Sequence, residues 1–116
     1  MAGLAGLVRQ FAERDGVTGA LIVSPDGLPI DHAGVVPDAE ALAALTVTLT
    51  RPATRLGESA ASGGLFRAVF EYDAGYALLT AVRGGHWLLV LARRDADVGT
   101  LLFDLRRDGP ALASLL

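Results

Sequence analysis

The sequence predicts an α+β fold in which a five-stranded antiparallel sheet carries helices on both faces, with the element order α-ββ-α-βββ-α. An Asp26-Gly27 pair separates two short apolar runs, which is a strong signal for a β-hairpin. Three other segments repeat apolar residues every three or four positions, as amphipathic helices do. Short glycine-containing turns divide the stretch 65–92 into three β-rich runs, which is typical of an antiparallel meander. Together these signals indicate helices packed on an antiparallel sheet.

The first element is predicted to be an amphipathic helix within residues 3–15. Its apolar residues fall at positions i, i+3, i+4 and i+7, which places them on one helical face. The opposite face mixes both charge signs, which favours packing on a sheet over binding to a membrane surface. The apolar residues are Leu4, Leu7, Val8 and Phe11.

The predicted hairpin spans residues 17–34, and its apolar runs are 20–23 and 28–30. A type I′ turn at Asp26-Gly27 is expected, because glycine and aspartate tolerate the positive φ angles that this turn needs. Neighbouring side chains of a strand point to opposite faces, and both faces of the first run are apolar. We therefore expect its strand to be covered on both sides, with the turn setting the register and nothing more.

Residues 37–58 combine helix and strand signals. Stretch 45–50 alternates leucine or valine with threonine, which favours a strand. Leucines recurring every three or four residues, and a length of about 20 residues without a turn signal, favour a helix. We predict a helix that begins after an Asp38 cap, has Glu40 in its first turn and is kinked before Pro52. The recurring leucines are Leu42, Leu45, Leu49 and Leu56.

Residues 59–64 form a small-residue loop, and strands are predicted at 65–72, 76–82 and 86–92. The last of these runs is apolar almost throughout, so we expect it at the centre of the sheet.

A final helix is predicted for residues 95–107, capped by Asp95 or Asp97. Residues 108–110 are expected to interrupt it, and Pro110 to restart a short turn through Leu116.

Composition limits the classes of function. The 116 residues suit a single domain spanning 1–116. The net charge of −3 provides no basic field for nucleic acid, and no segment is long and apolar enough to insert into a membrane. No cysteine is present and no secretory signal is recognised, so a cytoplasmic protein is expected. The hydrophobic content of 52% reflects either many alanines or a surface that a partner covers.

No catalytic or metal-binding constellation is apparent, so neither an enzyme nor a cofactor is expected. His32 and His86 each lie at a predicted strand end without metal-ligand spacing, and surface-turn histidines explain them better. Gly84-Gly85 lies between strands and has no following Lys-Ser/Thr, so it indicates a hairpin turn and not a phosphate-binding loop. The serines lack a nucleophile elbow.

The chain resembles the roadblock/dynein light-chain family over nearly its whole length. The resemblance is carried by GVTGALIVSPDGLPI at 16–30, the helix that begins at Asp38 and ends with Leu-Gly-Glu at 56–58, and the strand at 66–72. The resemblance continues in two further stretches, YALLTAVRGGHWLLVLA at 76–92 and DADVGTLLFDLR at 95–106. Pro52 inside the long helix departs from the usual pattern.

The resemblance implies a roadblock (profilin-like or longin-like) architecture and a non-enzymatic function. Family members are small dimeric modules that bind and regulate Ras-like GTPases or serve as dynein light chains. This chain looks most like the bacterial members that regulate gliding motility and stimulate GTP hydrolysis. They rearrange the GTPase and donate no arginine finger, so Arg51 and Arg55 are not assigned that role.

The resemblance further implies a homodimer in which the third strands pair antiparallel and the second helices pack side by side. The expected interface residues are Phe66, Arg67, Ala68, Val69, Phe70 and Glu71. The expected partner-binding residues of the long helix are Glu40, Ala43, Val47, Thr50, Arg51 and Arg55.

Charge pattern predicts the register of that strand pair. With the dyad at Val69, Arg67 of each copy lies opposite Glu71 of the other, whereas a dyad at Ala68 places Leu65 opposite Glu71. Alternatively, Phe66, Val69 and Phe70 belong to the core of a monomer.

Two other functions remain open on the sequence. A small-ligand sensor shares the sheet-and-helix pattern, but it needs a cavity with converging polar groups, and no such set is evident. A general dimerisation adaptor without a GTPase partner would use the same surfaces.

Overall fold

The computed structural model describes residues 3–116, which form three helices and five strands in the predicted order. A 3₁₀ turn at Arg83–Gly85 joins the last two strands. Within the described residues, no helix combines the length and hydropathy that crossing a bilayer requires. The elements are α1 (Leu4–Ala12), β1 (Val17–Val23), β2 (Pro29–Gly34), α2 (Ala39–Ser59), β3 (Arg67–Tyr72), β4 (Gly75–Val82), β5 (His86–Arg93) and α3 (Val98–Ala113).

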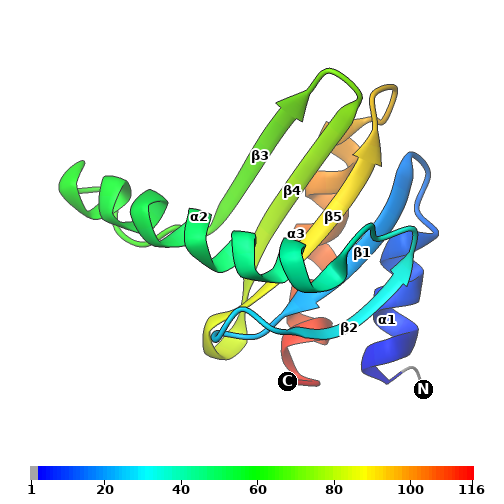
Figure 1. The fold of residues 1–116 in the computed structure, drawn as a ribbon, viewed down its shortest axis with the longest axis horizontal. Helices are drawn as coiled ribbons and strands as arrows, with labels where there is room; N and C mark the ends of the chain where they lie inside the picture. Colours follow the sequence, from blue (N-terminus) through cyan, green and yellow to red (C-terminus); the bar gives the residue numbers. More distant parts are fainter. Residues whose placement is uncertain (1–2) are drawn as a thin grey trace.

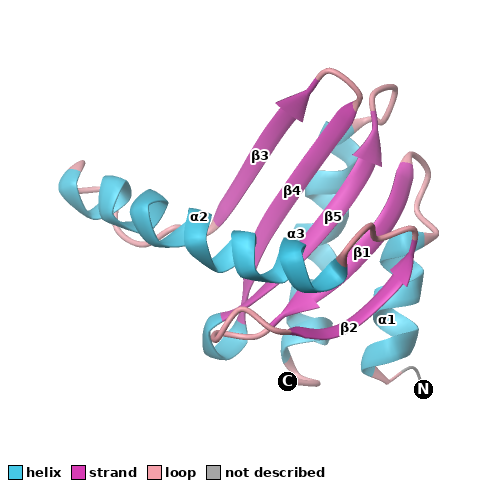
Figure 2. Cartoon of the chain, viewed as in Figure 1, coloured by secondary structure: helices cyan, strands magenta, loops and turns pink. Residues whose placement is uncertain are grey.

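The strands form one sheet in the order β2-β1-β5-β4-β3, and all neighbouring strands are antiparallel. Strand β5 occupies the centre, as predicted for residues 86–92. Helix α2 crosses one face of the sheet, and α1 and α3 cover the other face (Figures 1 and 2). The predicted α+β class with helices on both faces is therefore confirmed, and β2 and β3 are left as the two edges.

Strand β1 is buried on both faces, as its two apolar faces predict. Ala20 and Ile22 belong to the cluster formed with α1 and α3, whereas Leu21 and Val23 belong to the cluster beneath α2. All four side chains are at most 1% exposed. The apolar face predicted for the first helix also joins the α1–α3 cluster, as expected of an amphipathic helix.

The hairpin forms over the predicted residues, but its turn is not type I′. Gly27 has a φ angle of +82°, whereas Asp26 has no positive φ. The Gly27 N–H donates to the Ser24 carbonyl at 2.9 Å, which makes Pro25 and Asp26 the central residues of the turn. Proline cannot adopt the positive φ that a type I′ turn would need there.

This turn also does more than set register. A Cβ placed on Gly27 would lie 3.4 Å from the Val47 side chain and 3.5 Å from the Cα of Ala44, so the turn lies directly against α2. The expectation that the turn serves register alone is therefore wrong, because the turn packs against α2.

Both long helices contain a proline. The ambiguous segment 37–58 is helical, and Asp38 caps it by accepting a hydrogen bond from the Ala41 N–H at 3.1 Å. Helix α2 runs through Pro52 without interruption, and the kink before Pro52 stays a prediction.

The predicted break in the last helix is wrong, because α3 continues through Pro110 to Ala113. Two interactions hold this region in place. Arg14, just beyond α1, donates to Asp108 at 2.6 Å, and the Leu112 side chain is fully buried. These contacts offset the hydrogen bond that proline removes from a helix. Asp97 caps the start of the helix, as one of the two predicted alternatives.

Gly19 of β1 provides a test of how tightly the hairpin packs. A Cβ at this position would lie 2.2 Å from the Val35 carbonyl oxygen, which is backbone and cannot rotate away. We expect Gly19→Ala to lower the free energy of unfolding by about 1–3 kcal/mol, measured by urea denaturation.

Gly99→Ala is the matched control, because a Cβ there lies at an ordinary distance of 3.5 Å from Asp97. It should leave stability unchanged or raise it by up to about 1 kcal/mol through better helix propensity. Equal unfolding midpoints for the two variants would show that stability does not depend on the absence of a side chain at position 19.

Candidate functional site

Helix α2 turns its small side chains toward the sheet. Ala43, Thr46 and Thr50 are at most 5% exposed, and their spacing of three and four residues forms one helical face. The buried hydroxyl of Thr46 donates to the Leu42 carbonyl at 2.8 Å, and that of Thr50 donates to the Val47 carbonyl at 3.2 Å. Their hydrogen bonds stay within the helix, so the threonines can be buried without a polar partner in the sheet.

A row of leucines lies beside this buried face and stays partly exposed. Leu45, Leu49 and Leu56 are 54%, 45% and 72% exposed. Three exposed leucines on one helix are unusual where smaller residues of the same helix are buried, because a buried leucine contributes about 1.5–3 kcal/mol relative to an exposed one. Helix α2 therefore presents an apolar row, called here the outer leucine row, that the chain itself covers only in part.

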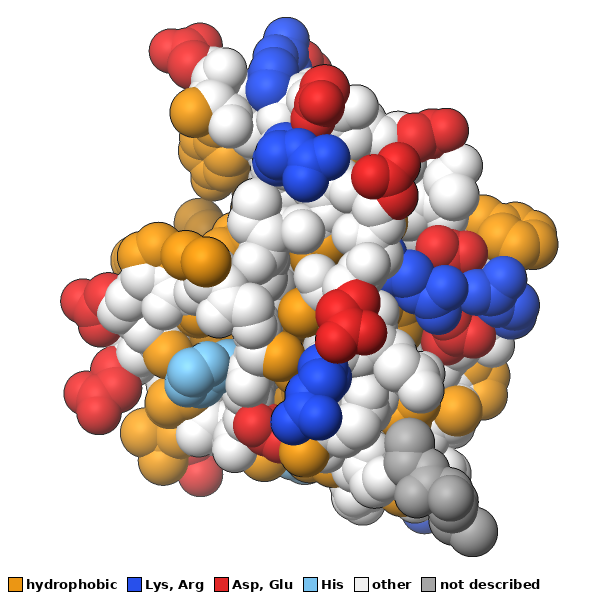
Figure 3. Space-filling view, turned by 90° about the vertical axis from the view of Figure 1, so that its right-hand side faces the viewer, with side chains coloured by type: hydrophobic (Ala, Val, Ile, Leu, Met, Phe, Trp, Pro, Cys, Tyr) orange, Lys and Arg blue, Asp and Glu red, His pale blue; other side chains and the backbone are white. Residues whose placement is uncertain are grey.

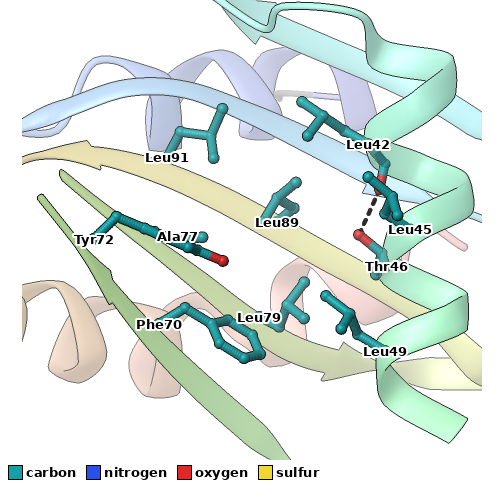
Figure 4. A pocket seen from close by; sticks show the side chains of 10 residues that line it. All are labelled: Leu42, Leu45, Thr46, Leu49, Phe70, Tyr72, Ala77, Leu79, Leu89 and Leu91. Carbon is teal, nitrogen blue, oxygen red and sulfur yellow. Dashed lines mark hydrogen bonds between the residues drawn. The ribbon is translucent and has the colours of Figure 1, made fainter. Parts of the chain in front are cut away.

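An apolar groove of about 220 Å³ lies between this helix and the far part of the sheet (Figure 4). Side chains from α2 form one wall, and side chains from β3, β4 and β5 form the other. The Thr46 hydroxyl already donates within the helix, so the groove offers few polar groups to orient a small ligand. The lining residues are Leu42, Leu45, Thr46, Leu49, Phe70, Tyr72, Ala77, Leu79, Leu89 and Leu91.

Strand β3 borders the same groove and is an edge of the sheet, so one side of its backbone lacks a strand partner. Val69 and Tyr72 are 42% and 56% exposed, and Phe66, which precedes the strand, is 65% exposed. Phe70 instead packs against the core beneath α2. The monomer-core alternative therefore fits Phe70 but does not fit Phe66 or Val69.

The charged residues of β3 face the α3 side of the sheet. Glu71 forms an ion pair with Arg94, whose guanidinium also donates to the Tyr76 hydroxyl at 3.2 Å. The hydrogen bond to Glu71 is the main cause that raises the pKa of Arg94 above its ordinary value. Arg67 donates from Nε to Thr80 at 3.3 Å and lies over the Phe66 ring, 4.9 Å from its centroid.

The C-terminal half of α2 extends beyond β3 and past the edge of the sheet (Figure 1). Arg51, Arg55 and Leu56 on this half are exposed. A short helical segment is only marginally stable in water unless its apolar side chains pack against something. The C-terminal half of α2 is therefore expected to need a covering surface.

The structure separates the six predicted partner-binding residues into three sets. Glu40, Arg51 and Arg55 are exposed, as a contact with a partner requires. Ala43 and Thr50 are buried against the sheet, so their assignment to a partner-facing surface needs correction. Val47 is half-buried and packs against the core beneath α2.

Sequence reasoning missed the outer leucine row as a surface, although it used the same leucines to predict the helix. The row of leucines and the row of alanine and threonine both follow helical spacing, so periodicity alone does not say which row faces inward.

The six predicted interface residues all lie along the β3 edge. Phe66, Val69 and Glu71 are exposed, and Arg67, Ala68 and Phe70 are half-buried.

Neither histidine belongs to a metal-ligand group. His32 is exposed on β2, and Nδ1 of His86 lies 3.0 Å from the Arg83 carbonyl oxygen. Among residues 3–116, no three histidine or acidic side chains gather as metal ligands would. The face that Figure 3 shows carries acidic and basic side chains intermixed, without a continuous field of one sign.

A family model for the Roadblock/LC7 domain matches residues 5–92. This chain belongs to the Roadblock/LC7 family. No curated protein matches it in sequence. A solved Roadblock/LC7 domain from Streptomyces avermitilis is 28% identical, with a TM-score of 0.82, and the match covers 97% of this chain and 93% of that one.

Two structures of MglB share the Roadblock fold at lower identity. MglB from Myxococcus xanthus is 16% identical with a TM-score of 0.89, and the match covers 97% of this chain and 93% of that one. The gliding protein MglB from Thermus thermophilus is 15% identical with a TM-score of 0.88, and the match covers 97% of this chain and 87% of that one. The resemblance inferred from sequence is thus confirmed at the level of family and fold.

The assignment of the two faces of α2 can be tested with two alanines. Ala43→Leu adds a large side chain where the alanine is fully buried, and we expect it to cost about 1–3 kcal/mol of unfolding free energy. Ala41→Leu, on the exposed side of the same helix, should leave stability within about 0.5 kcal/mol. Thermal unfolding followed by circular dichroism measures both, and an Ala41→Leu variant that loses as much stability as Ala43→Leu would contradict the assignment.

Proposed function

We propose that this Roadblock/LC7 protein is a dimeric, non-enzymatic regulator or scaffold that binds a small Ras-like GTPase. The observation that carries the proposal is the outer leucine row of α2 beside the unpaired β3 edge. Both features belong to one side of the monomer, where Leu45 and Leu49 line the same groove as Tyr72. Such a continuous apolar surface with a free strand edge favours a protein partner over a small polar ligand.

A second copy of the chain is the first expected partner. An exposed strand edge with apolar side chains promotes pairing with another strand, and β3 has an edge of this kind. Antiparallel pairing of two β3 strands would continue the sheet from one copy into the other. The part of α2 that extends beyond β3 would then lie over the sheet of the partner, which would cover Leu56.

The dyad is proposed at Val69. Val69 is exposed and lies midway between Arg67 and Glu71, so each arginine would face a glutamate of the partner. Pairing at the same dyad places Ala68 opposite Phe70 of the partner, which would add apolar contacts on the α2 side of the sheet.

The GTPase is proposed to bind on the exposed surface of α2. Glu40, Arg51 and Arg55 remain exposed there, and neither arginine forms an ion pair within residues 3–116. Charged residues around apolar ones suit a regulated interface, because charges steer association while apolar side chains supply affinity. Membership of the Roadblock/LC7 family supports this class of partner.

Binding to the Ras-like GTPases of the same organism tests this proposal. Each GTPase is loaded with GDP or a GTP analogue and mixed with the dimer, and affinity and GTP hydrolysis are both measured. We expect affinity to depend on the nucleotide. Nucleotide-independent binding, or none, would leave a dimerisation adaptor as the better description.

The same assay distinguishes a rearranging regulator from one that donates an arginine finger. Replacing both Arg51 and Arg55 by alanine should weaken binding by about tenfold, yet leave hydrolysis at saturation within about threefold of wild type. Loss of a finger would lower kcat by about 10³–10⁵. Arg9→Ala, an exposed arginine on α1, is the control and should change neither quantity.

The register of the proposed dimer is tested by charge reversal. Arg67→Glu would place two glutamates opposite Glu71 residues, and we expect the dimer dissociation constant to rise by about 2- to 30-fold in sedimentation equilibrium. Mixing it with a Glu71→Arg chain should restore association, because each substituted residue would then face an opposite charge. Dimerisation of Arg67→Glu at wild-type affinity would argue against the Val69 dyad.

A further inference from the structure

A second groove, of about 240 Å³, lies on the α3 side of the sheet at the β3 edge. It is formed by the start of β3, the end of β4 and the C-terminal half of α3, and three of its lining residues are arginines. The residues that line it are Phe66, Arg67, Thr80, Ala81, Val82, Arg83, Leu105, Arg106, Gly109, Pro110 and Ala113.

The arginines of this groove have no carboxylate partner. Arg67, Arg83 and Arg106 form no ion pair with any of the residues 3–116. The arginines among residues 3–116 that do form ion pairs are Arg14, Arg93, Arg94 and Arg107. Three arginines that line one groove without a carboxylate of their own chain give it a local positive charge, which suits an anion from outside the monomer.

Arg67 and Arg106 lie close enough to repel each other. Burial, and after it the positive charge of Arg106, lowers the pKa of Arg67 below its ordinary value. A carboxylate between two guanidinium groups would relieve this repulsion and accept hydrogen bonds from both.

We propose that Arg67 and Arg106 of one copy together bind the Glu71 carboxylate of a second copy, so that each groove is completed only in the dimer. The inference rests on the proposed β3 pairing and adds a residue of α3 to it. By symmetry, a dimer would contain two such sites.

The placement of Glu71 follows from strand geometry. Arg67, Val69 and Glu71 alternate with residues that face α2, so they face the α3 side, where Arg106 lies. A dyad at Val69 brings Glu71 of the partner directly opposite Arg67, at the groove. Glu71 uses Oε2 for its bond to Arg94 of its own chain, and a carboxylate accepts bonds at both oxygens.

This arrangement would select a second copy over an unlike Roadblock chain. Each copy contributes both the arginine pair and the glutamate, so only a partner that has both can complete the two sites of the dimer. A partner that lacks the glutamate would leave Arg67 and Arg106 facing each other without a counter-ion, which disfavours the mixed dimer.

A double-mutant cycle tests the proposal, with dimer dissociation constants measured by sedimentation equilibrium at low salt. Arg106→Gln should raise the dissociation constant by about 2- to 30-fold, because two sites are weakened per dimer. In a Glu71→Gln background, Arg106→Gln should not change the dissociation constant further, since the carboxylate that Arg106 is proposed to bind is already absent. High salt should reduce the difference between wild type and Arg106→Gln.

Arg107→Gln is the matched control, because Arg107 pairs with Asp104 and Asp108 of its own chain. It should change the dissociation constant less than twofold, and circular dichroism checks that each variant is folded. An equal loss with Arg106→Gln in both backgrounds would show that another anion, such as phosphate or an acidic partner, occupies the groove, and would overturn the proposal. A wild-type dimer with an unaffected Arg106→Gln variant would overturn this inference alone, whereas a monomeric wild type would overturn the proposed dimer as well.

Discussion

The close packing of α2 on the sheet through small side chains is the constraint on which the exposed surface of this protein depends. Ala43, Thr46 and Thr50 bring the helix near β1 and β2, and the threonine hydroxyls find acceptors within the helix itself. The hairpin turn at Gly27 packs against the same helix. Once this face is inward, the leucine row beside it is only partly covered, and Leu45 and Leu49 border the groove. The monomer is thus stabilised in a way that leaves an apolar surface uncovered.

Apolar and charged residues at the β3 edge are suited to different roles in binding a partner. The exposed leucines and Val69 are suited to supply affinity, since they are not directional and bury area in any arrangement. Arg67 and Glu71 are suited to specify which arrangement is adopted, since their contribution depends on which residues face each other. The leucines lie on the α2 side of the sheet, whereas Val69 shares the α3 side with Arg67 and Glu71, so the two kinds of residue meet at one short edge. A partner that fits only the apolar side would still meet unfavourable charges on the other.

Much of the fold could be predicted from the sequence, because local signals agreed with the final packing. The hairpin, the apolar face of the first helix and the two apolar faces of the first strand each depend on neighbours in the chain. The turn type and the end of α3 could not be predicted in this way. The turn depends on which residues its hydrogen bond spans, and α3 continues past Pro110 because Arg14, 94 residues away from Asp108, holds that region.

The candidate site was less accessible to sequence reasoning. A helix in which leucines and threonines alternate by face normally buries the leucines, yet here the threonines are buried. Which face of α2 lies inward depends on the distance between the helix and the sheet. That distance depends on contacts, such as those at Gly27 and Ala43, that form only when the chain has folded. The arginine groove was missed for a similar reason, because Arg67 and Arg106 are far apart in sequence and meet only through the packing of α3 on β4.

The length of α2 beyond β3 has a consequence for how long the protein survives in a cell. Ordering a residue costs about 1–2 kcal/mol of conformational free energy, and this half of the helix has little of its own chain to pack against. In the proposed dimer this half of the helix would gain packing from the partner, whereas β1 is already buried within its own chain. A frayed segment with exposed leucines is a preferred substrate for proteases and a signal for chaperones. The cell could thus remove unassembled copies and spare assembled ones without a dedicated degradation sequence.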